Sequence, residues 1–183
     1  MSSSEVIQRI ENRSVILETE RLLLREMALS DLDSLHEVLS DAEAMRFYPE
    51  PFDRSMSQAW IERNIQRYAK DGFGLWALIF RRSGELIGDC GLVLQSVEGE
   101  KVVEIGYHVR RDLWGQGLAT EAARACCDYG FNQLGCTKLI SLIHPDNTSS
   151  QRVAQKVGMS LRQTTEWQNK PVRIYEIERS GKA

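Results

Sequence analysis

The sequence has few of the residues from which metal sites and disulfides are built. Its 183 residues include four cysteines, with no CxxC pair among them, and three histidines that lie far apart. A zinc site needs clustered Cys and His ligands, so this pattern argues against one. Unpaired cysteines are typical of a reducing compartment, and we therefore expect a cytoplasmic protein.

Long apolar runs and a surplus of positive charge are also missing. No apolar stretch is long enough to cross a bilayer, and the N-terminal segment MSSSEVIQRIENRS lacks the basic-then-apolar layout of a signal peptide. The formal net charge is −3, without the basic field that nucleic-acid-binding proteins show. We expect neither a membrane nor a nucleic acid as a partner.

What is present is the ordinary composition of a globular domain. Hydrophobic residues make up 42% of the chain and charged residues 27%. A chain of this length most simply forms one domain with a buried core. We expect a flexible leader over 1–15, a single domain over 16–179 and a short tail over 180–183.

Hydrophobic periodicity predicts a mixed α/β fold with the order β-α-α-β-β-β-α-β-α-β-β. The predicted strands span 16–27, 74–80, 85–94, 102–109, 138–144, 160–167 and 172–179. Apolar residues at helical spacing predict helices after Ser30, over about 56–69, over 118–132 and over 149–158. The three middle strands are joined by short turns, as an antiparallel meander requires.

A glycine turn opens the third predicted helix. In the stretch WGQGLATEA, Gly115 and Gly117 lack the Cβ atoms that would hold an anion away from the backbone. The helix start that follows offers free N–H groups and the positive end of a dipole, which together favour phosphate binding. The alternative is a turn that only needs positive φ angles, and the motif alone does not decide.

Two other phosphate-binding folds fit the sequence less well. A P-loop would continue with Gly-Lys-Ser/Thr, whereas this helix opens Gly117-Leu118-Ala119. A dinucleotide-binding fold would place an acidic residue about 20 residues further on. Residues 137–140 contain none, and the preceding strands form a meander instead of βαβ units.

The element order and this motif together resemble the GCN5-related N-acetyltransferases. The family's acetyl-CoA signature, Gln/Arg-x-x-Gly-x-Gly/Ala, falls on residues 114–119, with Trp114 replacing the first residue. The segments ETERLLLRE, EIGYHV and NTSSQRVAQKVGM resemble the branch of the ribosomal-protein N-terminal acetyltransferases. The likeness runs over about 16–178. It implies a mostly antiparallel sheet with helices on both faces and with its fourth and fifth strands splayed apart.

By this resemblance the cofactor is acetyl-CoA. Backbone amides over about 116–120 would hold its pyrophosphate, and the end of the strand before the turn would offer backbone groups to the pantetheine arm. The residues implied at the cofactor site are His108, Val109, Trp114, Gly115, Gln116, Gly117, Leu118, Ala119, Thr120, Asn147 and Ser150.

Asn147 and Ser150 follow Pro145, which ends a strand because proline cannot donate to a sheet ladder. They match the branch's Asn-x-x-Ser pattern. The resemblance implies that the Asn147 amide bonds pantetheine and that the Ser150 hydroxyl acts as donor or general acid near the sulfur. The alternative for both residues is local helix capping. Many members of the branch lack a definite acid, and their thiolate leaves to solvent.

Acetyl transfer to an amine needs a group that accepts a proton from the nucleophile. Strand alternation places Glu104, Gly106 and His108 on one face. Several family members have a catalytic glutamate at the position of Glu104, so we expect Glu104 to be the base. The alternative is a solvent-facing glutamate paired across the meander. His108 could relay protons or be a hydrogen-bonded strand histidine.

The acceptor is expected to be a primary amine, either a protein N-terminus or a small molecule, that attacks the thioester directly in a ternary complex. Tyr48 and Phe52 in the proline-bearing loop and Trp76 on the second predicted strand could line its pocket, although a strand Trp often belongs to the core. Two alternatives remain, a coenzyme A-binding regulator without turnover and a nucleotide-binding protein. The family is often dimeric, so a homodimer is one expected assembly.

Overall fold

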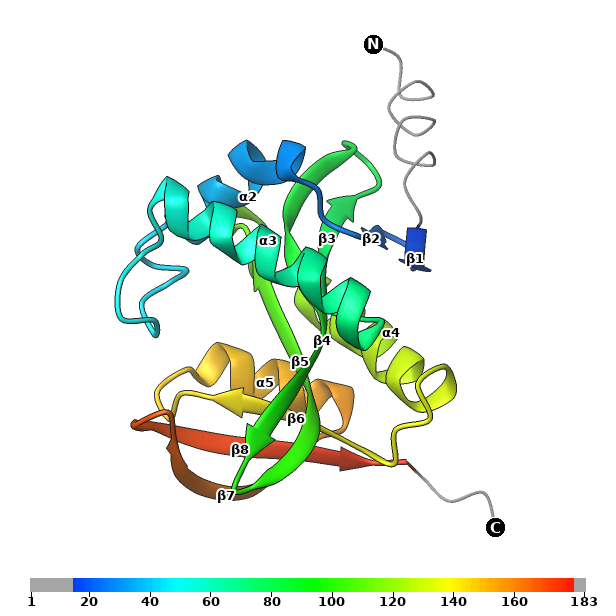
Figure 1. Ribbon diagram of the computed structural model, residues 1–183, viewed down its shortest axis with the longest axis vertical. Helices are drawn as coiled ribbons and strands as arrows, with labels where there is room; N and C mark the ends of the chain where they lie inside the picture. The colour runs from blue at the N-terminus through cyan, green and yellow to red at the C-terminus, as the bar shows by residue number, and fades with distance from the viewer. Residues whose placement is uncertain (1–14, 180–183) are drawn as a thin grey trace.

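The computed structural model describes residues 15–179 (Figure 1). Of the predicted leader only Val15 is described, as the first residue of a strand, and the predicted tail over 180–183 lies outside the described residues. Within this range the strands are β1 (Val15–Glu18), β2 (Leu22–Arg25), β3 (Leu75–Phe80), β4 (Glu85–Val97), β5 (Glu100–Val109), β6 (Lys138–Ile143), β7 (Ser160–Trp167) and β8 (Lys170–Glu178). The α-helices are α2 (Leu32–Leu39), α3 (Arg54–Asp71), α4 (Leu118–Asn132) and α5 (Thr148–Val157).

The strands form one sheet in the order β1-β2-β3-β4-β5-β6-β8-β7. Neighbouring strands run antiparallel, except for β5 and β6, which run parallel. The predicted α/β class with a mostly antiparallel sheet is therefore confirmed. The meander β3-β4-β5 is confirmed as well, because only residues 81–84 and 98–99 separate its strands.

The first predicted strand is wrong, because residues 16–27 contain two strands and a turn. The Thr19 N–H donates to the Leu22 carbonyl at 2.9 Å, and the Leu22 N–H donates to Thr19 Oγ1 at 3.0 Å. These bonds close a tight turn, after which β2 folds back antiparallel on β1. Apolar residues lie on both sides of the turn, so hydrophobic periodicity predicted one continuous strand.

The two middle strands β5 and β6 separate soon after they meet. Their only paired position among the described residues is Glu104 opposite Ile140. One residue further along, a side-chain hydrogen bond takes the place of a backbone bond between the strands. Ser141 Oγ of β6 donates to the Ile105 carbonyl of β5 at 2.9 Å. The ends of the two strands then point apart (Figure 1). The predicted splay between them is confirmed.

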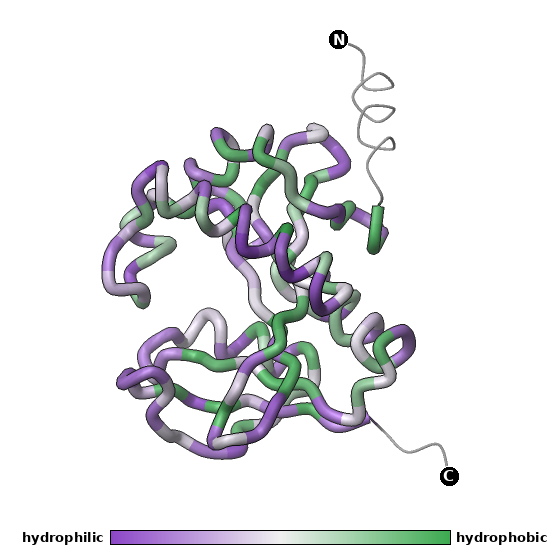
Figure 2. Tube along the Cα trace, viewed as in Figure 1, coloured by the Kyte–Doolittle hydropathy of each residue, from purple (hydrophilic) through white to green (hydrophobic). Residues whose placement is uncertain are grey.

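Helices cover both faces of the sheet. Helices α4 and α5 lie over one face, where Ala122, Ala123 and Cys126 of α4 are buried in the core. These small side chains let α4 lie close to the strands. Helices α2 and α3 lie over the other face and bury Leu35 and Ile61. The trace is mostly hydrophobic where the central strands cross the middle of the molecule (Figure 2). Between residues 15 and 179, no helix is both long and apolar enough to span a bilayer.

Candidate active site

The turn that opens α4, which we call the glycine corner (residues 114–120), has the backbone shape that the sequence indicated. Gly115 and Gly117 have φ angles of 77° and 80°, a left-handed conformation that glycine adopts without strain. A Cβ atom added to Gly115 would meet no protein atom within 4 Å. Positive φ angles and open space beside the backbone therefore occur together.

The N–H groups at the start of α4 are free to bind a ligand. The Glu121 N–H is the first to donate inside the helix, to the Gly117 carbonyl at 3.0 Å. Gly117 is the N-cap and brings no side chain to the N–H groups of residues 118–120. In the described part of the chain these groups have no acceptor. Unpaired donors at the positive end of a helix dipole are the arrangement that binds phosphate.

The turn between β1 and β2 supports the glycine corner. Glu121 accepts hydrogen bonds from Thr19 Oγ1 and from Arg21 Nε, each at 2.6 Å. Arg21 also donates from Nη1 to the Gln116 carbonyl at 2.9 Å. Burial raises the pKa of Glu121, but these hydrogen bonds outweigh burial and hold the pKa below its usual value. The positive charge of Arg21 offsets the negative charge of Glu121, which would otherwise repel an anion at the glycine corner.

Glu104 lies at the point where β5 and β6 part. Its Oε2 accepts from Gln95 Nε2 at 2.7 Å, and its Oε1 accepts from the Leu142 N–H of β6 at 3.3 Å. The side chain is partly buried and is paired across the meander with Gln95 of β4, so the pairing of the alternative is present but not its full exposure to solvent. Burial raises the pKa of Glu104. A raised pKa brings a carboxylate closer to the range of an effective proton acceptor.

Ser150 bonds to a tyrosine that the sequence argument did not select. Ser150 Oγ lies 2.7 Å from the Tyr107 hydroxyl, which also reaches the Ser150 carbonyl at 3.1 Å. Burial raises the pKa of Tyr107, so the phenol keeps its proton. Over residues 103–109 Tyr107 is the one polar side chain on its face of β5. A phenol among apolar side chains needs a polar partner, and that requirement was the available signal.

Asn147 takes the capping role that was one of its two alternatives. Its side-chain oxygen accepts from the Ser150 N–H at 3.1 Å, and Asn147 is the N-cap of α5. The Ser150 hydroxyl takes no part in this cap. Capping therefore explains one side-chain atom of Asn147 and leaves the role of the Ser150 hydroxyl open.

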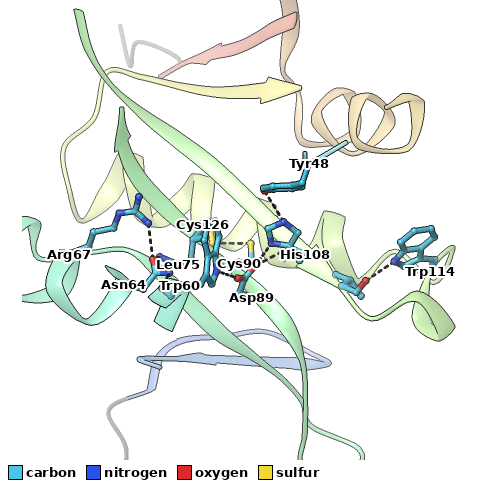
Figure 3. A network of polar contacts seen from close by, with 11 residues as sticks. Tyr48, Trp60, Asn64, Arg67, Leu75, Asp89, Cys90, His108, Trp114 and Cys126 are labelled. Carbon is cyan, nitrogen blue, oxygen red and sulfur yellow. Dashed lines mark hydrogen bonds and ion pairs between the residues drawn. The ribbon is translucent and has the colours of Figure 1, made fainter. Parts of the chain in front are cut away.

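A second polar network surrounds His108 (Figure 3). Strand alternation places His108 on the same face of β5 as Glu104. His108 Nδ1 lies 2.8 Å from Asp89 Oδ1, and His108 Nε2 lies 2.9 Å from the Tyr48 hydroxyl. Trp60 Nε1 donates to the other oxygen of Asp89 at 2.7 Å. Asp89 has no exposed surface. These contacts show that both ring nitrogens of His108 have hydrogen-bond partners, and the role of a proton relay stays a prediction.

Two of the backbone groups expected to hold pantetheine already have partners in the protein. The His108 N–H donates to Asp89 Oδ1 at 3.1 Å. The Val109 carbonyl accepts from Trp114 Nε1 at 2.6 Å (Figure 3). The Trp114 indole, 42% exposed, thus ties the glycine corner to the end of β5.

Comparison with known proteins identifies the family. The sequence model described as the acetyltransferase (GNAT) domain matches residues 21–160, which is more than half of the chain. This chain belongs to the GNAT acetyltransferase family. The family resemblance drawn from the sequence is therefore confirmed, and the chain is an N-acetyltransferase of this type.

Relatives of this acetyltransferase occur in Bacillus subtilis. The protein YkkB is 40% identical over 166 residues, which cover 90% of this chain and 96% of YkkB. YnaD, named an uncharacterized N-acetyltransferase, is 32% identical over 142 residues, which cover 77% of this chain and 80% of YnaD. Among solved structures, the ribosomal L7/L12 α-N-protein acetyltransferase RimL in complex with coenzyme A has a TM-score of 0.74. That match is 16% identical and covers 90% of this chain and 98% of RimL, so it shows a shared fold.

One predicted acceptor residue of the acetyltransferase lies elsewhere. Trp76 is 1% exposed, and its ring packs edge-on against Tyr129 of α4 at 5.3 Å between centroids. It belongs to the core and lines no acceptor pocket, so the core alternative was the right one. Tyr48 is 36% exposed and lies beside His108, with Phe52 buried behind it.

Proposed function

We propose that this acetyltransferase moves the acetyl group of acetyl-CoA to a primary amine by direct attack within a ternary complex. The proposal is carried by three features on neighbouring elements: a free helix N-terminus with open space beside Gly115, a pair of strands that part, and a partly buried carboxylate where they part. The helix N-terminus and the open space beside it can bind a diphosphate. The gap between the strands can hold the extended pantetheine arm, and the carboxylate of Glu104 can accept a proton from an amine.

The glycine corner fits the phosphate end of acetyl-CoA. Its N–H groups over 118–120 lack acceptors, and the space beside Gly115 is open. We assign the pyrophosphate to the backbone of 116–120 and the pantetheine to the gap between β5 and β6, bordered by Asn147. The fold shared with RimL, whose structure contains coenzyme A, supports this assignment.

Bound acetyl-CoA would supply an activated acyl group and a thiolate leaving group. Glu104 would accept a proton from the amine at its carboxylate, because burial already raises its affinity for protons. Ser150 would hold a proton at Oγ for the sulfur, and the Tyr107 hydroxyl at 2.7 Å would replace that proton. No acyl-enzyme is needed, since both protein groups act only on protons.

The acceptor class is a protein N-terminal amine or a small-molecule amine. An α-amino group, with a pKa of about 7.7–8.0, asks less of a base than a lysine at about 10.4. We further propose that the protein works in the cytoplasm, in keeping with its four free cysteines, and as a homodimer, in keeping with the family resemblance. Light scattering of the purified protein tests the second point.

An acceptor screen that follows free thiol release tests the proposed function. Peptides, amino acids, polyamines and aminoglycosides are each mixed with acetyl-CoA and the protein, with the protein's own thiols subtracted. Calorimetry with acetyl-CoA, NAD and ATP accompanies the screen. Tight binding of acetyl-CoA alone, together with amine-dependent thiol release, is the expected result. Binding without release from any amine would instead identify a coenzyme A-binding regulator, and tighter binding of NAD or ATP would identify a nucleotide-binding protein.

A further inference from the structure

We propose that Tyr48, His108 and Asp89 form a proton relay that removes a proton from the acceptor amine. The proposal rests on the proposed function and adds a catalytic group to it. In this relay the amine contacts Tyr48 Oη, the proton passes to His108 Nε2, and Asp89 positions the imidazole.

The carboxylate at the inner end of the relay is fixed from several sides. Asp89 lies on β4, opposite His108 on β5. It accepts from Trp60 Nε1 at 2.7 Å, from the His108 N–H at 3.1 Å and from His108 Nδ1 at 2.8 Å. A buried carboxylate needs such partners, and only a protonated Nδ1 can donate to it. Asp89 therefore selects the tautomer in which Nε2 has a free lone pair.

The outer end of the relay reaches the surface. The His108 side chain is 11% exposed, whereas Tyr48 is 36% exposed. The Tyr48 hydroxyl lies 2.9 Å from His108 Nε2, so it can donate its proton there and accept one from an amine. A phenol has an ordinary pKa of about 10, so Tyr48 keeps its proton at neutral pH between turnovers. The residue of the relay that faces solvent is therefore Tyr48, a neutral hydrogen-bond donor whose proton can pass to His108.

The relay is also well placed along β5. The backbone of His108 is part of the strand end proposed to border pantetheine, and strand alternation places its imidazole on the same face of β5 as Glu104. The imidazole points away from α4, toward the loop and helix α3 that carry Tyr48 and Trp60 (Figure 3). The other charged groups that act on this network are Glu104 of the same face and Arg63, whose guanidinium lies 5.2 Å from the Trp60 ring centroid.

The proton balance of the step is complete. An acceptor ammonium loses one proton through Tyr48 to His108, and Asp89 stabilises the resulting imidazolium. The amine nitrogen then bonds to the acyl carbon while the carbon–sulfur bond breaks. The nitrogen loses its second proton to Glu104, and Ser150 Oγ gives one proton to the sulfur. Tyr107 replaces the proton of Ser150 and recovers its own from solvent, while His108 and Glu104 each release one proton to solvent.

The test compares H108Q, Y48F and D89N with wild type, using the best amine from the acceptor screen. We measure kcat and KM across pH, acetyl-CoA affinity by calorimetry and the melting temperature. H36Q is the matched control, since His36 also bonds a side chain, Ser57 at 3.0 Å, but lies on α2. We expect H108Q to lower kcat/KM about 100-fold or more, in the range of general base catalysis.

The pH profile separates catalysis from a structural role. H108Q should change the shape of the pH profile of kcat/KM relative to wild type, whereas H36Q should keep the wild-type profile. Y48F should lose about 10-fold, on the scale of one well-placed hydrogen bond to a titrating group. D89N should lose more than Y48F, because an amide that donates to Nδ1 would select the wrong tautomer. Acetyl-CoA affinity should stay within twofold in H108Q and Y48F.

The relay is overturned if H108Q keeps wild-type kcat/KM and its pH profile. A loss that appears only as weaker acetyl-CoA binding or a lower melting temperature overturns it as well. Because Asp89 is buried, D89N can fail to fold. Whether the relay exists is therefore decided by H108Q and Y48F. If the wild-type protein acetylates an amine and H108Q does so at the same rate, the relay alone is refuted. A wild-type protein that releases no thiol with any amine refutes the proposed function and the relay together.

Discussion

The two faces of strand β5 differ in chemistry, although both belong to one strand of ten residues. The face toward α2 and α3 carries Glu104 and His108, two groups that accept protons. The face toward α4 and α5 is apolar over 103–109 except for Tyr107, whose hydroxyl meets Ser150. The pleat of a strand separates these sets, since successive side chains point to opposite sides. In our account, the amine and the leaving sulfur are therefore served from opposite sides of one sheet.

The largest effect should follow from the acidic residue of the first face. E104Q removes the proton acceptor but keeps a side chain of the same shape at the strand opening. We expect kcat/KM to fall about 100-fold or more, with acetyl-CoA affinity within twofold of wild type. Steady-state thiol release and calorimetry measure the two quantities. E100Q, an exposed glutamate on the same strand, is the control. Equal rates for E104Q and E100Q would remove Glu104 from the mechanism.

The next effect concerns the binding of acetyl-CoA. We assign the binding of its phosphates to the glycine corner and to neither face of β5. A side chain disfavours the φ of 80° of Gly117 by about 1–2 kcal/mol, so the turn in free G117A should relax away from this shape. Acetyl-CoA must then restore the turn, which should weaken its binding about 5- to 30-fold. G135A is the matched control, because Gly135 has a φ of 67° and open space but follows α4. Both variants should lose similar stability, and only G117A should lose affinity. Equal affinity in the two would show that the corner needs only its turn shape.

A smaller effect is expected on the second face. S150A and Y107F each break one hydroxyl pair, so kcat should fall about fivefold, the scale of a hydrogen bond of about 1 kcal/mol. The effect is modest because a thiolate is a good leaving group even without an acid. S149A, at an exposed neighbouring serine, should leave kcat unchanged. A loss of 100-fold in S150A would make Ser150 an essential acid, and no loss would mean that solvent protonates the sulfur.

The smallest effect is on stability and depends on pH. Burial raises the pKa of Glu104 in the folded protein above the value of about 4.3 expected in the unfolded chain. The stabilisation by its protonated form is complete below the unfolded pKa and is lost as pH rises through the folded pKa. Glutamine avoids this loss, so E104Q should melt a few degrees above wild type at about pH 8. The difference should shrink toward pH 4, as thermal melts at both pH values would show. A less stable E104Q at every pH would mean that the bonds from Gln95 and Leu142 matter more.

Local features of the fold followed well from the sequence. The glycine corner, the N-terminus of α4 and the face of β5 that holds Glu104 all depend on residues close in the chain. Trp76 did not follow, because β3 is buried on both faces and alternation cannot separate core from pocket there. The turn within the first predicted strand was missed for a similar reason.

The polar networks could not be assembled from the sequence because their members are distant in the chain. Tyr48 and His108 are 60 residues apart, and Arg21 and Glu121 are 100 residues apart. One signal was available, since Asp89 interrupts an otherwise apolar strand and a buried carboxylate must have partners. That signal predicts a network around Asp89 without naming its members.

A crystal structure with a bisubstrate analogue, in which coenzyme A is joined to an amine, tests the central claim most directly. Our account predicts phosphates on the backbone of 116–120, the arm between β5 and β6, and the amine on the face of Glu104 and His108. An amine on the α4 side of β5, or phosphates bound away from the glycine corner, would contradict it.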